Sequence, residues 1–242
     1  LYLVIFWICC KPNCSEEMRK IAIDTRDLKK GKTGTFTYLQ SLCSEWENNP
    51  EVVFIAYPFS VYKGPSVVGK IGEHVLFFLW KQLYLPAYCF FFGVDALLCT
   101  DYFLPLLPMR TKKYVVFHDA FFFEQPEHYN GIWLRLFYGL AVPAAKRAAA
   151  VIVPTEYVKE RLKKFIPDLG RVEVITEGAK PFPVISGPSA YDKPYVLHVG
   201  TLDHRKNLPR LVQAFSRLDW DGLLVLAGDS PAYAGSNGRI AL

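Results

Sequence analysis

The sequence predicts an α/β fold in which helices cover both faces of a parallel sheet. Short apolar runs of strand length alternate along the chain with longer stretches of helical periodicity, the pattern typical of such a sheet. Apolar residues make up 51% of the 242 residues and charged residues 21%, which excludes disorder and supplies a core. Val115, Val116 and Phe117 are consecutive, which indicates a strand buried on both faces.

The elements of this alternation follow one another from residue 21 to residue 178. Strands are expected at 21–24, 52–57, 94–100, 113–119, 149–154 and 171–178. Helices are expected at 35–47, where Leu39, Leu42, Cys43 and Trp46 share one face, at 131–149, and at 155–165. The last of these begins at Thr155, a good N-cap, and places Val158, Leu162 and Phe165 on its inner face.

Two segments raise the question of a membrane. Residues 75–93 are apolar and long enough to span one, but Lys81, Gln82 and Pro86 lie in the middle, where charge is unfavourable in hydrocarbon. A buried or interfacial helix broken near Pro86 is therefore favoured. The helix at 155–165 carries Lys159, Arg161, Lys163 and Lys164 on its outer face, which either is solvated or contacts anionic lipid headgroups.

Composition divides the chain into parts. Residues 1–18 begin with the apolar run LYLVIFWICC and end at Met18, and we expect them to be an N-terminal extension outside the fold. Residues 19–180 form the first domain, and the proline-rich residues 181–194 form a linker. Residues 195–242 hold strands at 195–200 and 223–228 around a helix near 207–218. Because so few elements cannot cover a sheet, we expect this second domain to be incomplete.

The first candidate site follows the first strand, at GKTG (31–34). A phosphate-binding P-loop would need glycine where Arg26 stands, so that motif is absent. Gly31, Gly34 and Thr35 instead indicate a glycine-rich turn that lets a ligand approach the N-terminus of the next helix. An ordinary strand-to-helix turn is the alternative.

The second candidate site is His118 with Asp119, at the carboxyl end of a buried strand. Ligands of open α/β sheets bind beyond these ends, although a lone histidine is often structural. No serine or cysteine lies in a nucleophile elbow, and no histidine spacing indicates a metal site. The six cysteines contain no C-x-x-C pair and suit reduced thiols in a cytoplasmic protein.

The third candidate site is HVGTLDHRKN (198–207). Gly200 ends a strand, and the cations Arg205 and Lys206 precede a helix whose dipole would oppose them unless an anion were bound there. Two cations beside free helix N–H groups favour a diphosphate site over a plain basic helix start.

Five segments together resemble glycosyltransferase family 4. They are IAIDTRDLKKGKTGTFTYLQSL, WKQLYLPAYCFFFGVDALLCTDYFLPL, VVFHDAFFFEQPEHY, VIVPTEYVKERL and PYVLHVGTLDHRKNLPRLVQAF, and they cover about residues 19–228. The resemblance is closest to bacterial members that build cell-surface polysaccharides, often mannosyltransferases. It implies a GT-B fold of two Rossmann-like domains, with the acceptor on the first domain and a nucleotide-diphosphate sugar on the second.

The resemblance also implies roles for the candidate residues. Arg205 and Lys206 would neutralise the donor diphosphate, Gly200 would lie near its phosphates, and His118, supported by Asp119, would line the cleft near the transferred sugar. Gly31, Gly34 and Thr35 would belong to a cleft loop, and Thr155 and Glu156 would support the cleft. The reaction would be retaining hexose transfer with neither metal nor cofactor, to a glycan or lipid-linked acceptor, in the cytoplasm or peripherally on its membrane face.

Two alternatives stay open. Family members continue for roughly another 130 residues, about one further domain, with a pair of donor-side glutamates, so we expect a C-terminally truncated chain. An inactive fragment or membrane-associated binding module of the same fold is therefore one alternative. The other is a nucleotide-sugar-modifying Rossmann enzyme, although IAIDTRDLKKG lacks the G-x-G-x-x-G that it would need. The net charge of +5 is too small to require a nucleic-acid partner, and none is expected.

Overall fold

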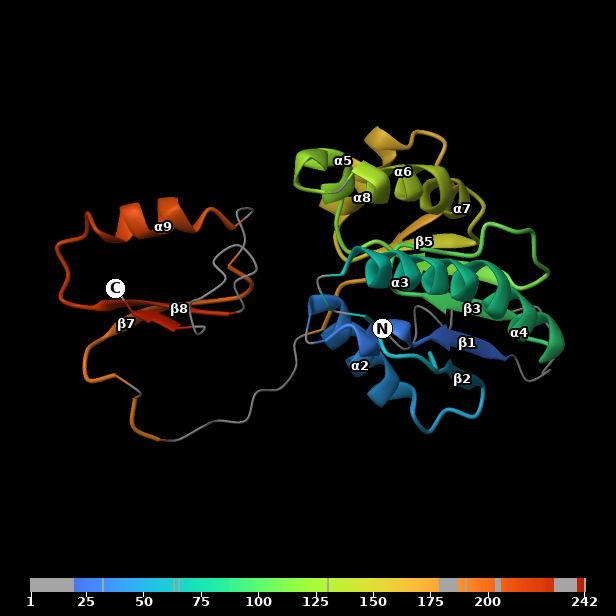
Figure 1. Ribbon diagram of the computed structural model, residues 1–242, viewed down its shortest axis with the longest axis horizontal. Coiled ribbons are helices and arrows are strands. Elements are labelled where there is room, and N and C mark those ends of the chain that lie inside the picture. The colour runs from blue at the N-terminus through green and yellow to red at the C-terminus, as the bar shows by residue number, and fades with distance from the viewer. Residues whose placement is uncertain are drawn as a thin grey trace. The chain divides into compact units, whose positions relative to one another are not determined.

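The computed structural model describes two compact units, residues 1–179 and 180–242 (Figure 1). The described residues are 20–178 apart from 32, 63, 65 and 130, then 187–189, 191–202, 206–228 and 239–241. The expected extension, residues 1–18, lies outside them, as do Arg205 and half of the expected linker. Each unit is considered by itself.

The first unit contains a six-stranded sheet in which every neighbouring pair of strands is parallel, as the sequence predicts. The spatial order is β2-β1-β3-β4-β5-β6, so the direction of winding reverses between β1 and β3. Such a switch point opens a crevice at the carboxyl ends of the strands. The strands are β1 (Ile21–Asp24), β2 (Val52–Ile55), β3 (Ala96–Cys99), β4 (Lys112–Val116), β5 (Ala150–Val153) and β6 (Val172–Val174).

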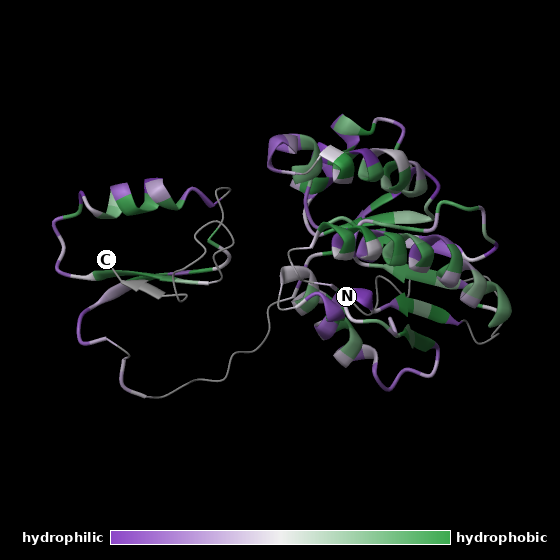
Figure 2. Ribbon diagram, in the orientation of Figure 1, coloured by the Kyte–Doolittle hydropathy of each residue, from purple (hydrophilic) through white to green (hydrophobic). Residues whose placement is uncertain are grey.

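Alternating side chains of these strands build two cores, one on each face of the sheet. On one face, Tyr114 and Val116 of β4 pack beneath α2 (Gly34–Trp46), which buries Leu39, Leu42 and Trp46 as expected. On the other face, Val115 and Phe117 join a larger core beneath the remaining helices. Most strand residues of the first unit are apolar (Figure 2).

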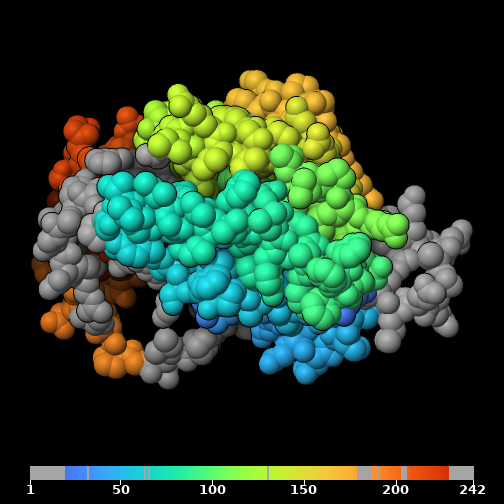
Figure 3. Space-filling view, turned by 45° about the vertical axis from the view of Figure 1, so that its right-hand side comes forward, coloured from blue at the N-terminus to red at the C-terminus, as the bar shows by residue number. Residues whose placement is uncertain are grey.

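The helix that covers the switch point is built in three consecutive segments: α3 (Val67–Leu79), the π-helical turn η2 (Trp80–Tyr84) and α4 (Leu85–Phe91). The Leu85 N–H bonds to the carbonyl of Trp80, five residues back, immediately before Pro86. The wider turn accommodates a proline that would clash with an α-helical carbonyl, so the expected break near Pro86 is a π turn. These segments form a continuous ridge over the first unit (Figure 3).

A second helix uses the same arrangement. It consists of α6 (Gly131–Leu136), the π turn η4 (Phe137–Ala141) and α7 (Val142–Lys146), with Pro143 near the start of α7. The remaining elements are η1 (Arg26–Lys29), α5 (Phe121–Glu124), η3 (Pro126–His128) and α8 (Glu156–Phe165). Val158 and Leu162 of α8 are buried as expected, but Phe165 is partly exposed and stacks on Phe123.

The π turn η2 places a lysine inside the protein. The Lys81 ammonium lies 2.5 Å from Asp24, at the end of β1, and 2.5 Å from Asp101, just beyond β3. The indole of Trp80 also donates to Asp24, at 2.9 Å. Burial alone would lower the pKa of Lys81, but Asp101 and Asp24 outweigh it and hold that pKa well above its usual value. The ion pairs therefore tie the helix to both sides of the switch point.

The second unit contains β7 (Tyr195–Val199), α9 (Leu208–Phe215), β8 (Leu223–Ala227) and β9 (Arg239–Ala241). β7 and β8 are parallel, and β9 pairs antiparallel to β8. The apolar side of α9 faces β7 and β8, where Leu208, Leu224 and Leu226 form a small core (Figure 2).

Two general features complete the description. Within the described part of the chain, we find no helix that is both long enough and apolar enough to cross a membrane. Cys43, Cys89 and Cys99 are free thiols, and burial raises the pKa of both Cys43 and Cys89 to about 11.

The buried lysine gives the first prediction. Lys81→Met should lower the free energy of unfolding at pH 7 by about 3–5 kcal/mol, because two carboxylates stay buried without their cation. The deficit should shrink on acidification: wild type loses stability as pH falls through the depressed pKa of Asp101, whereas protonation relieves the variant. Urea unfolding followed by circular dichroism between pH 2 and pH 7 measures both the deficit and its dependence on pH.

Lys146→Met is the matched control, because Lys146 pairs with Asp168 at 2.8 Å on the surface. It should leave the free energy of unfolding nearly unchanged at every pH. Equal losses of unfolding free energy in Lys81→Met and Lys146→Met would contradict the conclusion that the buried ion pairs stabilise the protein more than the surface pair does.

Candidate active site

The candidate active site lies along the carboxyl edge of the six-stranded sheet. Parallel strands all end at this edge, so the segments that follow β1, β3, β4 and β6 converge there. His118 follows β4, and Glu177 follows β6. Residues 100–102 follow β3, and α2 begins close to the same edge.

His118 is held by groups from three other segments. Its Nε2 lies 2.9 Å from the carbonyl oxygen of Thr100, and its Nδ1 lies 3.2 Å from Oε1 of Glu177. Both partners accept hydrogen bonds, so both contacts are hydrogen bonds only when the ring carries two protons, and a neutral ring donates to one of them. The rings of Tyr38 and Tyr102 meet the imidazole edge-on at 5.0 and 5.9 Å. The imidazole is thus oriented on several sides.

Tyr102 connects the histidine to the aromatic core. Its φ of 69° is unusual for a residue with a side chain and marks a backbone held by its surroundings. The ring packs against Phe117 and Phe122 at 5.3 and 5.2 Å. Burial, and next the nearby carboxylate of Asp119, raise the pKa of Tyr102 well above its usual value, so its hydroxyl stays protonated.

Asp119 organises the backbone beyond His118. Its Oδ1 accepts a hydrogen bond from the Phe121 N–H at 3.1 Å, where α5 begins. The carboxylate therefore fixes the turn that follows β4 and lies near Tyr102. Asp119 therefore affects the position of His118 indirectly, through the Tyr102 ring and through the backbone that joins residues 118 and 119.

The glycine-containing loop leads into α2, and α2 in turn contacts His118. Gly31 has a φ of 113°, which favours glycine, and Thr33 caps α2 by accepting from the Phe36 N–H. The hydroxyls of Thr33 and Thr35 lie 2.9 Å apart. A Cβ at Gly34 would meet no atom within 4 Å, so the start of the helix is open. Tyr38, one turn further along α2, contacts His118 and thereby brings the loop to the same edge.

Thr155 and Glu156 lie at the end of β5, next to β4 in the sheet. Thr155 accepts from the Val158 N–H and caps α8, while Glu156 pairs with Lys159 at 3.2 Å. Arg161 pairs with Glu124 of α5. Two of the four cations of the expected basic face are therefore paired within the protein, which weakens the interpretation of α8 as a lipid-contacting helix.

The second unit presents two glycines at the ends of neighbouring strands. Gly200 follows β7 with a φ of 150°, and Gly228 follows β8 with a φ of 155°. The Gly200 N–H donates to the carbonyl of Ala227 at 2.9 Å. A Cβ at Gly228 would lie only 1.8 Å from the Gly200 carbonyl oxygen, so the two backbones are closer than any side chain allows.

Lys206 is exposed just before the N-terminus of α9, next to Asn207, whose φ of 50° is left-handed. Pro209 has no N–H, and the next two N–H groups of α9 donate to the Asn207 carbonyl. An anion at this helix start would therefore meet the Lys206 ammonium and the N–H of the first residue of α9. Arg205 lies outside the described residues, so the geometry of the expected cation pair is described only for Lys206.

Four residues of these sites were not identified from the sequence: Tyr38, Tyr102, Glu177 and Gly228. Tyr102, Glu177 and Gly228 each follow a strand, the signal that identified His118 and Gly200. In the described segments, no three His, Cys, Asp or Glu side chains cluster as metal ligands do.

Residues 33–181 match Glycosyltransferase Family 4. No curated protein matches the sequence. The chain is similar to the crystal structure of Arabidopsis thaliana UGT89C1 complexed with UDP-L-rhamnose, at 12% sequence identity and a TM-score of 0.48. The similarity covers 87% of this chain and 65% of that one, so this chain spans about two thirds of that protein's length.

The glycines give the second prediction. Gly228→Ala should destabilise the second unit by about 1–3 kcal/mol, because the added Cβ strikes the Gly200 backbone at a φ that side chains rarely adopt. Gly34→Ala should be neutral or stabilise by up to about 1 kcal/mol, since α2 begins in open space. Hydrogen exchange of peptides from β8 and α2 measures both; a destabilising Gly34→Ala would show that the loop is already closely packed.

Proposed function

The chain belongs to glycosyltransferase family 4, and we propose that it transfers a hexose, mannose-like, from a nucleotide-diphosphate sugar to a glycan or lipid-linked acceptor with retention of configuration. One observation carries the proposal: the family match, residues 33–181, includes His118 and the three residues that converge on it, Tyr38, Tyr102 and Glu177. The reaction would serve cell-surface polysaccharide synthesis at the cytoplasmic face of a membrane.

In this proposal, the first unit binds the acceptor and the transferred sugar. His118, held by the Thr100 carbonyl and Glu177, presents its imidazole toward the sugar with little freedom to rotate. Asp119 fixes the turn beyond it. The open start of α2 at Gly34, with Gly31 and Thr35, lets a ligand approach the backbone closely. Thr155 and Glu156 keep α8 in place at the next strand.

The second unit binds the donor. Gly200 and Gly228 leave bare backbone at the strand ends, where phosphates can approach. Lys206 supplies a point charge and Arg205 a bidentate guanidinium for the diphosphate. Because negative charge grows on the diphosphate as the sugar leaves, these cations stabilise the transition state more than the bound donor. This electrostatic stabilisation takes the place of a metal ion or other cofactor.

The donor site gives the third prediction. Replacing Arg205 and Lys206 together by Ala should weaken binding of UDP or GDP at least about 10-fold, since charge-assisted hydrogen bonds are each worth about 1.5–3 kcal/mol. Isothermal titration calorimetry with the full chain measures the change. Arg217→Ala, an exposed cation beyond the far end of α9, is the matched control and should bind as wild type does. Unchanged binding in the double variant would refute the diphosphate assignment.

The sugar site gives the fourth prediction. His118→Ala should lower kcat for transfer from a nucleotide-diphosphate hexose about 100-fold, the typical effect of removing one group that stabilises a transition state. Nucleotide affinity should not change, because His118 lies in the other unit. The measurement is transfer of radiolabelled sugar to a lipid-linked or oligosaccharide acceptor.

His128→Ala is the control, since His128 is an exposed histidine on η3. Equal transfer by the His118 and His128 variants would argue against the assigned role. Nucleotide binding without transfer by any acceptor class would favour an inactive binding module of the same fold.

A further inference from the structure

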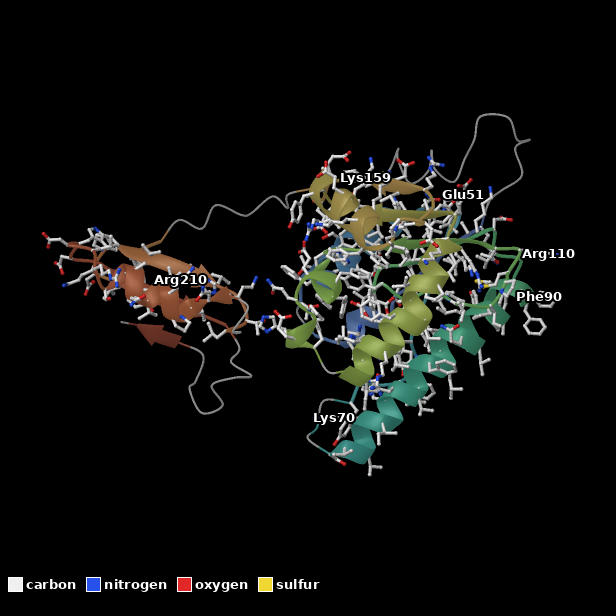
Figure 4. The ribbon with its side chains drawn as sticks, turned by 90° about the horizontal axis from the view of Figure 1, so that it is seen from above. Glu51, Lys70, Phe90, Arg110, Lys159 and Arg210 are labelled. Carbon is white, nitrogen blue, oxygen red and sulfur yellow. The ribbon has the colours of Figure 1, made fainter. Side chains whose placement is uncertain are left out.

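The outer face of the α3–η2–α4 helix is an exposed apolar surface. We define this outer face by Val68, Ile71, Val75, Phe78, Leu83 and Phe90, whose exposure ranges from 44% to 79%. The first four recur at helical spacing along α3, and Phe90 projects from the far end of α4 (Figure 4). Contiguous apolar surface of this kind marks an interaction site.

The helix cannot turn to hide this face, because its opposite side is fixed in the core. Trp80, Lys81, Leu85 and Cys89 are buried, and the Lys81 ammonium is held by both Asp24 and Asp101. Rotation about the helix axis would pull the ammonium away from two carboxylates and leave all three charges buried without their ion pairs. The exposure of the outer face is therefore a lasting feature of the fold.

The charges around the outer face are almost all positive. Residues 67–92, all of them described, contain a single acidic side chain, Glu73, and it turns inward to pair with Arg26. Lys70 is exposed near the start of α3.

Further cations lie at the other end of the helix. The Thr111 hydroxyl donates to the Val94 carbonyl just beyond α4, which places the exposed Arg110 and Lys112 there (Figure 4). The Lys20 ammonium lies 5.7 Å from the centre of the Phe92 ring. The carboxylate of Asp95 also lies at this end, where it accepts the backbone N–H of Lys20 at 2.9 Å.

We propose that the outer face is the membrane-binding surface of this protein and inserts at the headgroup–acyl boundary of an anionic bilayer. An apolar helix face with cations at its ends matches the amphipathic helices that lie in that boundary. A second copy of the chain fits less well. A two-fold antiparallel packing would bring Lys70 against Arg110 and Lys112 of the other copy, and a parallel packing would bring Lys70 against Lys70. Anionic lipid neutralises the same cations.

This surface also fits a lipid-linked acceptor. α3 begins after β2, at the carboxyl edge where His118 lies, so an acceptor in the bilayer would reach the sheet edge beside α3. This choice of acceptor rests on the proposed function, whereas membrane binding itself does not.

The experiment is co-sedimentation of the full chain with vesicles of phosphatidylcholine alone and with about 30% phosphatidylglycerol. Wild type should bind the anionic vesicles strongly and the neutral ones weakly. Phe78→Glu with Phe90→Glu should reduce the bound fraction on anionic vesicles at least 10-fold. Lys70→Glu with Arg110→Glu should abolish the preference for anionic lipid.

Leu218→Glu is the matched control, because Leu218 is 58% exposed in the second unit. It should bind vesicles as wild type does, and all variants should keep the wild-type circular dichroism. Equal vesicle binding by the Phe78/Phe90 variant and wild type would overturn the proposal. So would a wild-type dimer, detected by light scattering, that this variant abolishes without any vesicle binding.

The outcomes separate this surface from the proposed function. Nucleotide binding with no vesicle binding would reject the membrane surface alone. Vesicle binding with no nucleotide binding or sugar transfer would reject the glycosyltransferase assignment and leave the surface standing.

Discussion

The buried ammonium of Lys81 between Asp24 and Asp101 is the constraint on which the first unit depends. It joins the carboxyl ends of β1 and β3 at the point where the sheet reverses its winding, and it fixes the helix above them. Removing a charge from water costs several kcal/mol, which only close, paired partners offset. Loss of any one of the three charged groups would therefore leave the remaining charges buried and incompletely compensated. The loop after β3, which includes Tyr102 and the Thr100 carbonyl that holds His118, inherits its position from this pairing.

The sequence predicted the sheet well, because strands buried on both faces appear as short apolar runs and need no knowledge of their partners. It also located His118 and Gly200 at strand ends. It did not predict what surrounds them. Glu177 lies 59 residues from His118 along the chain, and only the strand order brings them together. Lys81 showed that residues 75–93 were unsuited to crossing a membrane, but its two carboxylate partners come from different strands, which local pattern cannot identify.

The two units use glycine for different physical reasons. Gly34 faces open space, so packing does not exclude a side chain there, and any requirement for glycine has to come from a ligand. Gly228 lies so close to the Gly200 carbonyl that a side chain is sterically excluded whether or not a ligand binds. A Cβ at Gly200 would lie at an ordinary contact distance of 3.9 Å from Nε2 of His198, so the φ of 150° is what favours glycine at this position. A glycine-rich motif in a sequence does not distinguish these cases, although their consequences for stability and binding differ.

The π turn explains why the two faces of the long helix could not be separated from sequence. A helical pattern read at 3.6 residues per turn loses its phase where five residues form a wider turn, so positions before Trp80 do not predict which side Phe90 occupies. The same turn gives room for Pro86 and places Trp80, Lys81 and Gln82 inside. Average hydropathy over 75–93 therefore combines an inner face, where a charge is held by protein carboxylates, with an outer face where apolar side chains meet the surroundings. The buried charge of Lys81 argues against a membrane-spanning helix, but it does not argue against binding to a membrane surface. By fixing the helix, it keeps the outer face exposed for contact with lipid.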